Sequence, residues 1–599
     1  MASAADATMY ADRFPPAELH RRPVDYQPKT WDYDSICSLQ EQAHKDDKHS
    51  KQSSLQTSLK RRVRQLFLEE EEELATRPMI ELATRLMIMD QLQSLGVAYH
   101  FEDEIKSILM SMHVYDAYLQ LKHDLSSTAL LFRLLRGHGI PASTDMLSSF
   151  RDANGDFKAA TPKDIDAFVA LHEATYLAFP GEAVLDEARA FAIKTLQELM
   201  PSMSISVVPA SQTETQGDLP LHWRVPRLQA TCSLKQHGYN DKSLSCRKID
   251  PSILHLAAVD FNLVQAVHGA ELLKVTKWWK ETGLGKKLPF ARDRLVECFF
   301  CAACIAPEPS LAGCREVLAK VGSLIVHLDD VYDLYGTVDE LAAFTDAIGS
   351  WCDEDALSLV AALPEYMKAM YCAIRSTSTG AADRVMKEQG GYDVLPLYKK
   401  AWHELCKAFL IEAKWQHDGQ MPCLEEYLEN GWVTSTGPLL LLHAFTMLQE
   451  QEQMDSWLRN HQDGDDMVMA YPKLVELCSM IFRLCNDCAT HEAESGRGEA
   501  ASAITCHMRG GASKEEAHAA VVDAIADTWK KVNMEAALCS RTGTGSAANR
   551  VCVNLARTIL CIYQDGDGIT SPKDSRKRMV KDMLFTPVDL DVCVAHGRA

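Results

Sequence analysis

The chain has 599 residues, of which 47% are hydrophobic and 24% are charged, a composition typical of globular proteins. This length exceeds one ordinary hydrophobic core and predicts either two large helical domains or two to four domains of usual size. The 62 Lys and Arg against 83 Asp and Glu give a net charge of −21, which argues against broad binding to nucleic acid or anionic membranes. A polyanionic substrate would therefore need metal ions or a local group of arginines.

Membrane insertion and secretion are both disfavoured by the sequence. The longest apolar stretch, near Pro438, has about a dozen residues, whereas a spanning helix needs about 20. The first 20 residues carry Asp6, Asp12 and Glu18 with little Arg or Ser, which makes a poor organelle transit peptide. We therefore expect a soluble protein of the plastid stroma or the cytosol, without nucleic-acid or membrane partners.

The 19 cysteines are scattered along the chain and do not form the compact framework of a small secreted protein. Cys298, Cys301 and Cys304 follow a C-x2-C-x2-C spacing that resembles part of an iron–sulfur binding segment. No cysteine stands at position 308, and a spacing of three places the thiols on one face of a helix. The sequence therefore favours free thiols that pack inside a helical core.

Residues 1–35 are expected to form an extended arm, because several prolines interrupt any helix. Arg21 and Arg22 lie within this arm, and Trp31 follows after eight intervening residues. Two adjacent arginines are most often simply solvated. On an arm that is anchored by a tryptophan, they could also close over an anionic site.

Residues 36–240 are expected to form an N-terminal helical domain that resembles an α-barrel. Apolar residues recur at intervals of three and four over 86–109 and 127–140, and no useful strand-like alternation appears. We find no D-x-D-D motif in this half, so it offers no candidate acid for chemistry that begins with protonation. Its expected role is support.

Residues 250–599 are expected to form a C-terminal helical bundle that encloses the active site. Polar stretches that contain Gly and Pro, at 209–220 and 237–251, mark the junction between the domains. Long amphipathic helices are predicted at 258–279, 292–304, 316–330 and 401–415. The predicted fold class is therefore all-α, with two helical domains.

Three carboxylates, Asp329, Asp330 and Asp333, follow the mostly apolar run 321–328. Asp329 and Asp333 lie one helical turn apart and would project from one face, about 6 Å apart. A lone cluster of this kind is most often a solvated helix end. Carboxylates that emerge from a buried helix instead need a compensating charge, such as a divalent cation.

A second stripe of oxygen donors supplies the partner for this cluster. Asn486, Thr490 and Glu494 recur at i, i+4 and i+8, and Arg483 lies about one turn before them. Polar helix faces often show such a pattern, so the stripe alone is weak evidence. Together with the aspartates it predicts a two-walled cage for several Mg²⁺ ions and a bound diphosphate.

These motifs resemble those of plant terpene synthases that ionise their substrate with metal ions, and the resemblance covers nearly the whole chain. In the C-terminal half the matching segments, beside the Asn486/Thr490/Glu494 stripe, are LDDVYDLYGTVDEL (328–341), RDRLVE (292–297), DFNLVQ (260–265), CKAFLIEAKW (406–415), EEYLENGWVTSTGP (425–438) and YQDGDG (563–568). In the N-terminal half they are LGVAYHFEDEI (95–105) and ALLFRLLRGHGI (129–140). The arm matches an Arg-Arg-x8-Trp signature that is associated in this family with monoterpene synthases.

The resemblance implies a role for particular residues. It implies that three Mg²⁺ ions, with Mn²⁺ as an alternative, grip the diphosphate through Asp329, Asp330, Asp333, Asn486, Thr490 and Glu494. The diphosphate-binding arginines that it implies are Arg292, Arg294 and Arg483. As catalytic residues it implies Asp329 and Asp333 together with Arg21, Arg22 and Trp31. Tyr563 is a candidate pocket residue whose ring faces the carbocation, although a core tyrosine explains it equally well.

Three positions depart from the family pattern and bear on the product. Cys301 stands where the family commonly has Trp, which enlarges the pocket and removes a ring that faces the cation. Ser502 stands where relatives often have Lys near the diphosphate, and Asp565 replaces the usual His or Tyr before Gly-Asp-Gly.

The sequence thus predicts a Mg²⁺-dependent lyase that converts geranyl diphosphate through a linalyl intermediate to a monoterpene hydrocarbon or alcohol, as a monomer or weak homodimer. A sesquiterpene synthase that uses farnesyl diphosphate is the nearest rival, favoured by small Cys301 and the poor transit peptide but opposed by Arg21, Arg22 and Trp31. A chain-elongating prenyltransferase is less favoured, because it should carry two Asp-rich motifs and the second motif here has the Asn/Thr/Glu form. An inactive helical scaffold is the remote alternative from a different class.

Overall fold

The computed structural model describes residues 26, 28–43, 48–68, 78–155, 157, 165–199, 219–239, 249–351, 356–389, 391–448, 471–497, 501–541 and 546–590. Within these ranges the chain is helical, and its strand-like pairings are limited to two isolated bridges, Arg151 with Phe157 and Gln564 with Gly566. The predicted all-α fold is confirmed. Arg21 and Arg22 lie outside the described residues, so their place relative to the site is not part of the structure.

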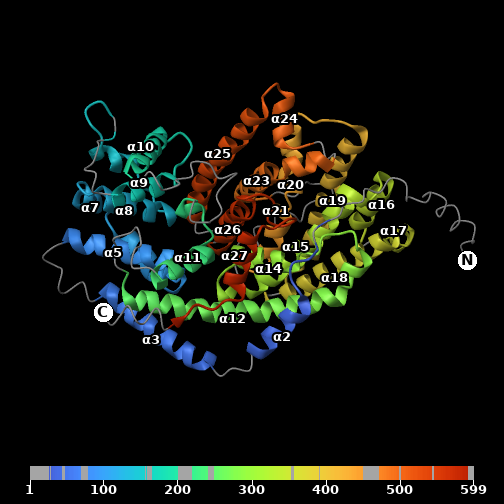
Figure 1. Ribbon diagram of the computed structural model, residues 1–599, viewed down its shortest axis with the longest axis horizontal. Helices are drawn as coiled ribbons and strands as arrows, with labels where there is room; N and C mark the ends of the chain where they lie inside the picture. The colour runs from blue at the N-terminus through green and yellow to red at the C-terminus, as the bar shows by residue number, and fades with distance from the viewer. Residues whose placement is uncertain are drawn as a thin grey trace, which may run out of the picture.

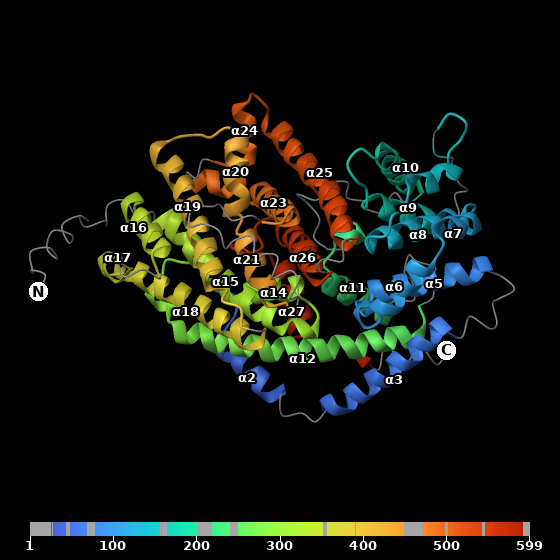
Figure 2. The same ribbon diagram turned by 180° about the vertical axis from the view of Figure 1, so that it is seen from behind.

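The helices form two lobes that lie side by side in Figures 1 and 2. The N-terminal half contributes α2 (Tyr33–Ala43), α3 (Lys48–Leu68), α5 (Pro78–Ser94), η2 (Ala98–His100), α6 (Glu102–Ser111), α7 (Val114–Leu121), α8 (Leu125–Gly137), η3 (Thr144–Phe150), α9 (Ile165–Thr175), α10 (Ala183–Leu199), η5 (Leu221–Trp223) and α11 (Pro226–Tyr239). The C-terminal half contributes α12 (Pro251–Thr282), α13 (Leu284–Lys287), α14 (Leu295–Ile305), η6 (Pro309–Leu311), α15 (Ala312–Asp330), η7 (Val331–Tyr335), α16 (Val338–Gly349), α17 (Ala356–Ala362), α18 (Glu365–Glu388), α19 (Leu395–Asp418), α20 (Leu424–Thr434), α21 (Gly437–Phe445), α23 (Lys473–Arg497), α24 (Ala503–Arg509), α25 (Lys514–Arg541), α26 (Ser546–Tyr563) and α27 (Asp574–Leu584).

The long helix α12 runs beneath both lobes, as Figure 1 shows. Its start is fixed by Asp250, whose side chain accepts a 2.7 Å hydrogen bond from the backbone N–H of Ser252, and by Pro251 in the first turn. Gly283 ends the helix in the left-handed conformation at φ 66°. These end signals leave 32 residues of continuous helix, long enough to serve both lobes.

Each lobe has its own hydrophobic core, and α12 contributes to both. Phe261, in its first half, belongs to the core of the N-terminal lobe, whereas Leu272 and Trp279 belong to the core of the C-terminal lobe. Tyr33 and Ile36 of α2 also pack into the C-terminal core, although they come from the beginning of the chain. The domain limits expected from the sequence stay a prediction.

Two of the predicted helical segments differ from the structure in their bounds. The stretch 86–109 is not one helix, because α5 ends at Ser94 and α6 begins only at Glu102. Gly96 lies between them at φ 72°, where an added Cβ would come within 2.9 Å of Ala230. In the C-terminal half, α14 begins at Leu295 and not at Arg292, so Arg292 and Arg294 both precede the helix.

The Asp-rich segment crosses a change of helix type. Asp329 and Asp330 end α15, and Asp333 lies in η7, a π-helical turn over Val331–Tyr335. The hydrogen bond from the Gly336 N–H to the Val331 carbonyl, at 2.8 Å, closes this wider turn. Single π-helical turns inside α-helices are frequently found at functional sites.

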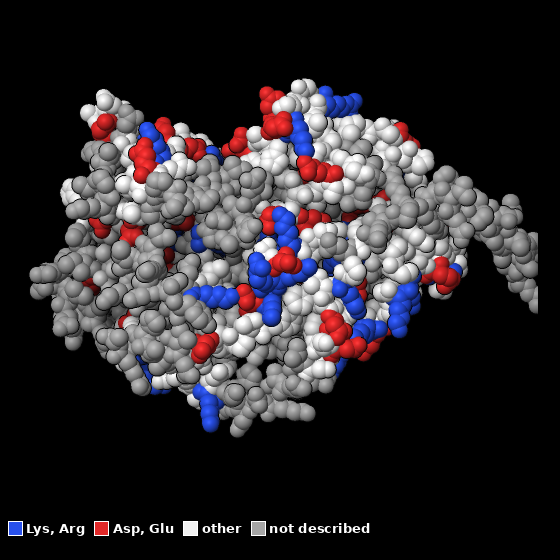
Figure 3. Space-filling view, viewed as in Figure 1, with Lys and Arg blue, Asp and Glu red and all other residues white. Residues whose placement is uncertain are grey.

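On the face shown in Figure 3, Lys and Arg side chains gather near the centre, in the region where Figure 1 draws α27. Several of the basic residues there are paired: Lys573 lies 2.5 Å from Asp565, Lys577 lies 3.5 Å from Asp574, and Lys235 lies 2.5 Å from Asp582. These pairs offset part of the local charge. None of the described helices is both long and apolar enough to cross a membrane.

Close packing at the start of α21 generates a prediction. A Cβ added at Gly437 would lie 2.3 Å from Ser479 Oγ and 3.2 Å from Ser479 Cα, so Gly437→Ala should destabilise the C-terminal lobe by about 1–3 kcal/mol. Gly380 is the matched control, because it lies within α18 with no atom within 4 Å of an added Cβ. Gly380→Ala should be neutral or stabilising by roughly 0.5–1 kcal/mol. Thermal unfolding measured by circular dichroism checks both, and equal midpoints for the two variants would contradict the expectation.

Candidate active site

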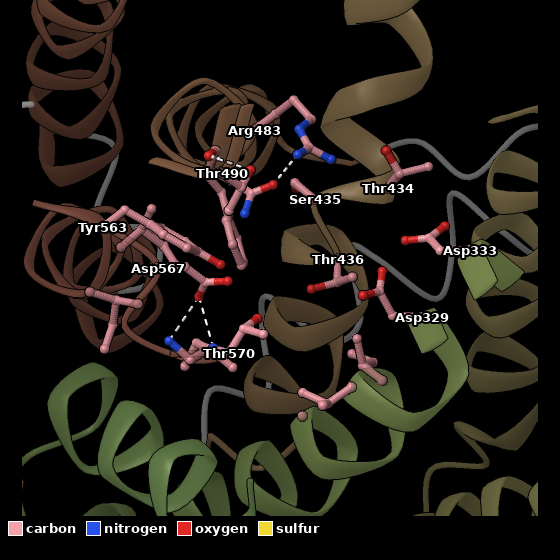
Figure 4. A pocket seen from close by; sticks show the side chains of 18 of the residues that line it. Asp329, Asp333, Thr434, Ser435, Thr436, Arg483, Thr490, Tyr563, Asp567 and Thr570 are labelled. Atoms are coloured by element: carbon pink, nitrogen blue, oxygen red, sulfur yellow. Dashed lines mark hydrogen bonds between the residues drawn. The ribbon is translucent and has the colours of Figure 1, made fainter. Parts of the chain in front are cut away.

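A cavity of about 240 Å³ opens inside the C-terminal lobe. Figure 4 shows it with Asp329 and Asp333 on one side and with Arg483 and Thr490 on the other. The first wall is the end of α15 with η7, and the second is α23. The two halves of the site predicted from the sequence therefore face the same enclosed space.

The aspartates of the first wall differ in how exposed their side chains are. Asp329 and Asp333 line the cavity, and the Asp329 side chain is 33% exposed. The Asp330 side chain is only 1% exposed and is not among the described residues that line the cavity. Burial raises the pKa of Asp329, and the nearby charge of Arg292 only partly opposes this effect. This carboxylate therefore lies where a further positive charge would stabilise it.

Arg292 holds the aspartates in place from the side. Its backbone N–H and its Nε both donate to Asp330 Oδ2, at 2.7 and 3.1 Å, and its Nη2 donates to Asp329. Its Nη1 donates to Thr570 Oγ1 at 2.9 Å. Burial alone would lower the pKa of Arg292, but Asp330 and Asp329 raise it well above its usual value. Arg292 is therefore a fixed cation at the polar end of the cavity, which Asp329, Asp333 and Arg483 also line and which we call its mouth.

The second wall has the stripe that the sequence predicts. Asn486, Thr490 and Glu494 all line the cavity, and Arg483 lines it one turn earlier on α23. Arg483 Nη2 donates to Asn486 Oδ1 and lies 2.8 Å from Asp487 Oδ1. The pKa of Arg483, which burial alone would lower, is raised well above its usual value, chiefly by Asp487.

Asp487 is fully buried and connects three helices behind this wall. It accepts hydrogen bonds from the Tyr427 hydroxyl of α20 at 2.9 Å and from the Ala503 N–H of α24 at 2.7 Å. Both oxygens of the carboxylate therefore have partners, with Arg483 on Oδ1 and the Ala503 N–H on Oδ2. Asp487 therefore fixes the second wall from outside the cavity.

The remaining surface of the cavity combines apolar and aromatic side chains with polar ones, among them Thr434, Ser435 and Thr436. Helix α14 contributes Cys298 and Cys301, α19 contributes Phe409, α23 contributes Phe482, and α26 contributes Tyr563. The pKa of the Tyr563 hydroxyl is raised well above its usual value by burial, so its ring is neutral. Both candidate pocket residues from the sequence, Cys301 and Tyr563, line the cavity.

Arg294 and Trp31 are not among the described residues that line the cavity. The Arg294 guanidinium donates to the carbonyls of Ile569 and Thr570, both at 2.9 Å, and so anchors the loop that follows α26. Trp31 Nε1 donates to Glu297 Oε1 at 3.1 Å, beside the start of α14. In this structure both residues position neighbouring segments of the chain.

Two of the three departures from the family pattern also lie away from the cavity lining. Ser502 caps the start of α24, where its Oγ accepts from the Thr505 N–H and lies 3.1 Å from His491 Nδ1. Asp565 forms an ion pair with Lys573 at 2.5 Å. Cys301 is therefore the departure that contacts the interior of the cavity.

Sequence reasoning missed several residues that the fold brings to the site. Tyr26 of the arm lines the cavity, and its hydroxyl donates to Asp330 Oδ1 at 2.9 Å. Asp567 lines it as well and accepts from the N–H groups of Ile569 and Thr570, at 3.0 and 2.9 Å. The half-buried Glu412 also lines the cavity and accepts from the Thr434 hydroxyl at 2.7 Å, and loss of solvent around it raises its pKa. The segment YQDGDG contained Asp567, but nothing in its pattern showed which carboxylate would face inward.

The donor atoms of the two walls fit Mg²⁺. They are carboxylate, amide and hydroxyl oxygens, which are the hard ligands that this ion prefers. Among the described residues, no three His, Cys, Asp or Glu side chains lie together as a ready metal site. The candidate ligands are divided between two walls and include Asn486 and Thr490, so both walls would supply ligands to bound ions. The assignment of individual ligands stays a prediction.

The contrast between neighbouring aspartates gives a second prediction. Asp330→Ala would leave the buried Arg292 without its main partner and should cost roughly 3–5 kcal/mol of local stability. Asp329→Ala removes a more exposed carboxylate and leaves the Arg292–Asp330 pair intact, so it should cost about 1 kcal/mol or less. Thermal unfolding of the two variants should differ clearly. A melting midpoint for Asp330→Ala equal to that of Asp329→Ala would show that Asp330 does not hold Arg292.

Comparisons with known proteins agree with this geometry. Residues 280–531 match the model of the terpene synthase family metal binding domain, and residues 30–215 match that of the terpene synthase N-terminal domain. The chain is 35% identical to the chloroplastic alpha-thujene synthase of Litsea cubeba over 97% of this chain and 93% of that protein.

Solved structures show the same likeness. A limonene synthase with 2-fluorolinalyl diphosphate superposes with a TM-score of 0.80 at 32% identity, over 95% of this chain and 100% of that one. The isoprene synthase of grey poplar (Populus x canescens), in complex with three Mg²⁺ ions and dimethylallyl-S-thiolodiphosphate, gives a TM-score of 0.76 at 34% identity, over 94% of this chain and 99% of that one. The chain therefore belongs to the terpene synthase family of carbon–oxygen lyases, which act on prenyl diphosphates.

Proposed function

We propose that the protein converts geranyl diphosphate to a monoterpene in a Mg²⁺-dependent reaction that releases diphosphate. The observation that carries this proposal is one cavity in which two oxygen-rich walls face each other above an apolar floor. Two similar proteins support a ten-carbon substrate: the alpha-thujene synthase, and the limonene synthase that was solved with 2-fluorolinalyl diphosphate.

The metal ligands of the proposal are Asp329 and Asp333 on the first wall and Asn486, Thr490 and Glu494 on the second. Three ions are proposed because the similar isoprene synthase was solved with three Mg²⁺ ions. When bound, the ions would draw electron density from the diphosphate and make it a better leaving group. Asp330 acts in this proposal through Arg292, which it holds in position.

The arginines of the mouth bind and orient the diphosphate. Arg292 and Arg483 lie on opposite walls, and both stay protonated because carboxylates surround them. Guanidiniums form charge-assisted, often bidentate hydrogen bonds with phosphate oxygens. Such contacts fix the leaving group at the mouth and direct the hydrocarbon chain toward the floor.

The floor folds the hydrocarbon chain and excludes water. The rings of Phe409, Phe482 and Tyr563 line it, and each could stabilise a nearby carbocation by about 0.5–2 kcal/mol. Hydrocarbon side chains such as Ile305, Leu318 and Leu440 also line the cavity and do not react with a cation. The product then depends on how this surface folds the chain before a proton is lost or water is added.

A sesquiterpene synthase remains the second candidate. Cys301 is a small side chain on the cavity floor, and a small residue there leaves room for a longer prenyl chain.

The names of the similar alpha-thujene and isoprene synthases both include "chloroplastic", and we propose the plastid as the location on that basis.

Incubation of the purified protein with Mg²⁺ and dimethylallyl, geranyl or farnesyl diphosphate tests the proposal. We expect volatile ten-carbon products from geranyl diphosphate, and chelation of Mg²⁺ with EDTA should abolish them because the carboxylates would lose the ions that bridge the walls. Asp329→Ala should lower turnover by at least about a thousandfold while its helical circular dichroism is retained. Fifteen-carbon products without ten-carbon products would overturn the choice of substrate, and retained turnover in Asp329→Ala would overturn the metal assignment.

The arm generates a further prediction from the sequence. Arg21→Ala should slow cyclisation of geranyl diphosphate by about tenfold more than cyclisation of supplied linalyl diphosphate, because the Arg pair is proposed to assist the isomerisation that linalyl diphosphate bypasses. Arg61→Ala is the matched control, since Arg61 lies in α3 of the other lobe. Equal losses on the two substrates would remove the arm from the isomerisation step.

A further inference from the structure

Two thiols lie on the floor of the reaction cavity. Cys298 and Cys301 of α14 both line it, whereas Cys304 packs in the core with its Sγ 3.9 Å from Met583 Sδ. The C-x2-C-x2-C run thus has two members that face the substrate space and one that does not. Cys301 is partly exposed there, whereas Cys298 is 8% exposed.

The thiols lie beside the hydrocarbon and away from the diphosphate. Cys298 packs against Gly322 of α15, where an added Cβ would lie 3.8 Å from its Sγ. Gly322 precedes Asp329 by seven residues, which is about 10 Å along the helix. Cys301 follows Cys298 by one turn of α14, in the direction that leads away from Arg294 and the mouth. The thiols therefore lie away from the aspartates, on the part of the cavity that the proposed function assigns to the hydrocarbon chain.

The chemistry of these thiols differs from that of the surface around them. Burial raises the pKa of Cys298 to about 12 and that of Cys301 well above its usual value, so both are neutral. A neutral thiol is a poor nucleophile toward ordinary reagents, which react with thiolate. A carbocation is electrophilic enough to bond to a neutral sulfur, whose lone pairs are soft and polarisable. The neighbouring Ala302, Ile305 and Leu318 offer no lone pair.

We propose that Cys301 is a modification site, where the thiol captures a fraction of the carbocations formed in the cavity and is converted to a prenyl thioether. This inference rests on the proposed function, because it needs an enzyme that ionises a prenyl diphosphate. Each capture ends the activity of that molecule, since the bound hydrocarbon fills the cavity floor.

The capture step balances without an oxidant or reductant. The carbon–oxygen bond to the diphosphate breaks, and its electron pair leaves with the diphosphate. A sulfur lone pair of Cys301 then forms a carbon–sulfur bond to the cation. The resulting protonated thioether gives its proton to the diphosphate, the strongest base enclosed with it. Thiol and prenyl diphosphate thus become thioether and protonated diphosphate.

Capture should occur at Cys301 and not at Cys298. The Cys298 sulfur is packed between α14 and α15 and shares a hydrogen bond with Ser323, so it has little freedom to approach the substrate. Cys301 has more exposed surface toward the cavity. Exposed Cys372 of α18 is a matched surface thiol in the same chain.

The experiment follows the full-length protein through many turnovers of geranyl diphosphate with Mg²⁺. Volatile products are collected, activity is measured over time, and the protein is then digested with chymotrypsin, which can cleave after Phe299 and Phe300 and so separates Cys298 from Cys301. Mass spectrometry should find one added ten-carbon unit on Cys301, rising in proportion to the lost activity. Cys298 and Cys372 should stay unlabelled.

Cysteine variants and a reaction without Mg²⁺ distinguish capture of a carbocation from direct alkylation by the diphosphate. Cys301→Ala should lose the adduct, while Cys298→Ala should keep it on Cys301. Adduct formation without Mg²⁺, or equal labelling of Cys372, would show direct alkylation by the diphosphate and would overturn the inference. Volatile product without any adduct on Cys301 would overturn the inference alone. No product from any prenyl diphosphate would overturn the proposed function and this inference with it.

Discussion

The guanidinium of Arg292, whose side chain is only 13% exposed, makes the interactions on which the rest of the site depends. It contacts Asp329 and Asp330 at the end of α15 and Thr570 in the loop after α26. It also lies 5.1 Å from the centre of the Tyr26 ring in the arm. Removing a guanidinium from water costs several kcal/mol, and the two carboxylates offset that cost only in this arrangement. One cation thus contacts three separate segments of the chain and holds them together.

This arrangement gives the cavity a polar mouth and an apolar floor. Charges concentrate where Arg292, Arg483 and the aspartates lie, and the floor presents aromatic, aliphatic and thiol groups. In an enclosed space of low dielectric, a cation is attracted strongly to the diphosphate from which it separated. Under the proposed function, the mouth would retain the counterion while the floor guides the cation. Ionisation and product selection would then depend on different residues.

Helical periodicity was sufficient to predict which residues of long helices share a face. The spacing of Asn486, Thr490 and Glu494 and the pair Asp329 and Asp333 are both found on the cavity, as expected, and the all-α fold is confirmed. It was harder to predict which of two adjacent residues faces the cavity, because neighbours in the sequence point to different sides. Asp330 and Arg294 stand close to cavity residues in the sequence, yet they are not among the described residues that line the cavity. They instead hold residues that do: Asp330 holds Arg292, and Arg294 holds Thr570. Tyr26 and Asp567 come from irregular segments, whose positions depend on tertiary contacts that no local pattern encodes.

The thiol on the floor shows how a single side chain changes what an inert surface can do. Hydrocarbon and aromatic side chains stabilise a cation without bonding to it, so the cation persists until a proton leaves or water enters. A thiol at the same place stabilises it less and offers a bond that ends the sequence. Because each 1.4 kcal/mol between competing barriers changes their ratio about tenfold, a modest advantage for proton loss suffices for many turnovers per capture. The number of turnovers before inactivation and the identity of the product then depend on the same small differences between competing barriers at Cys301.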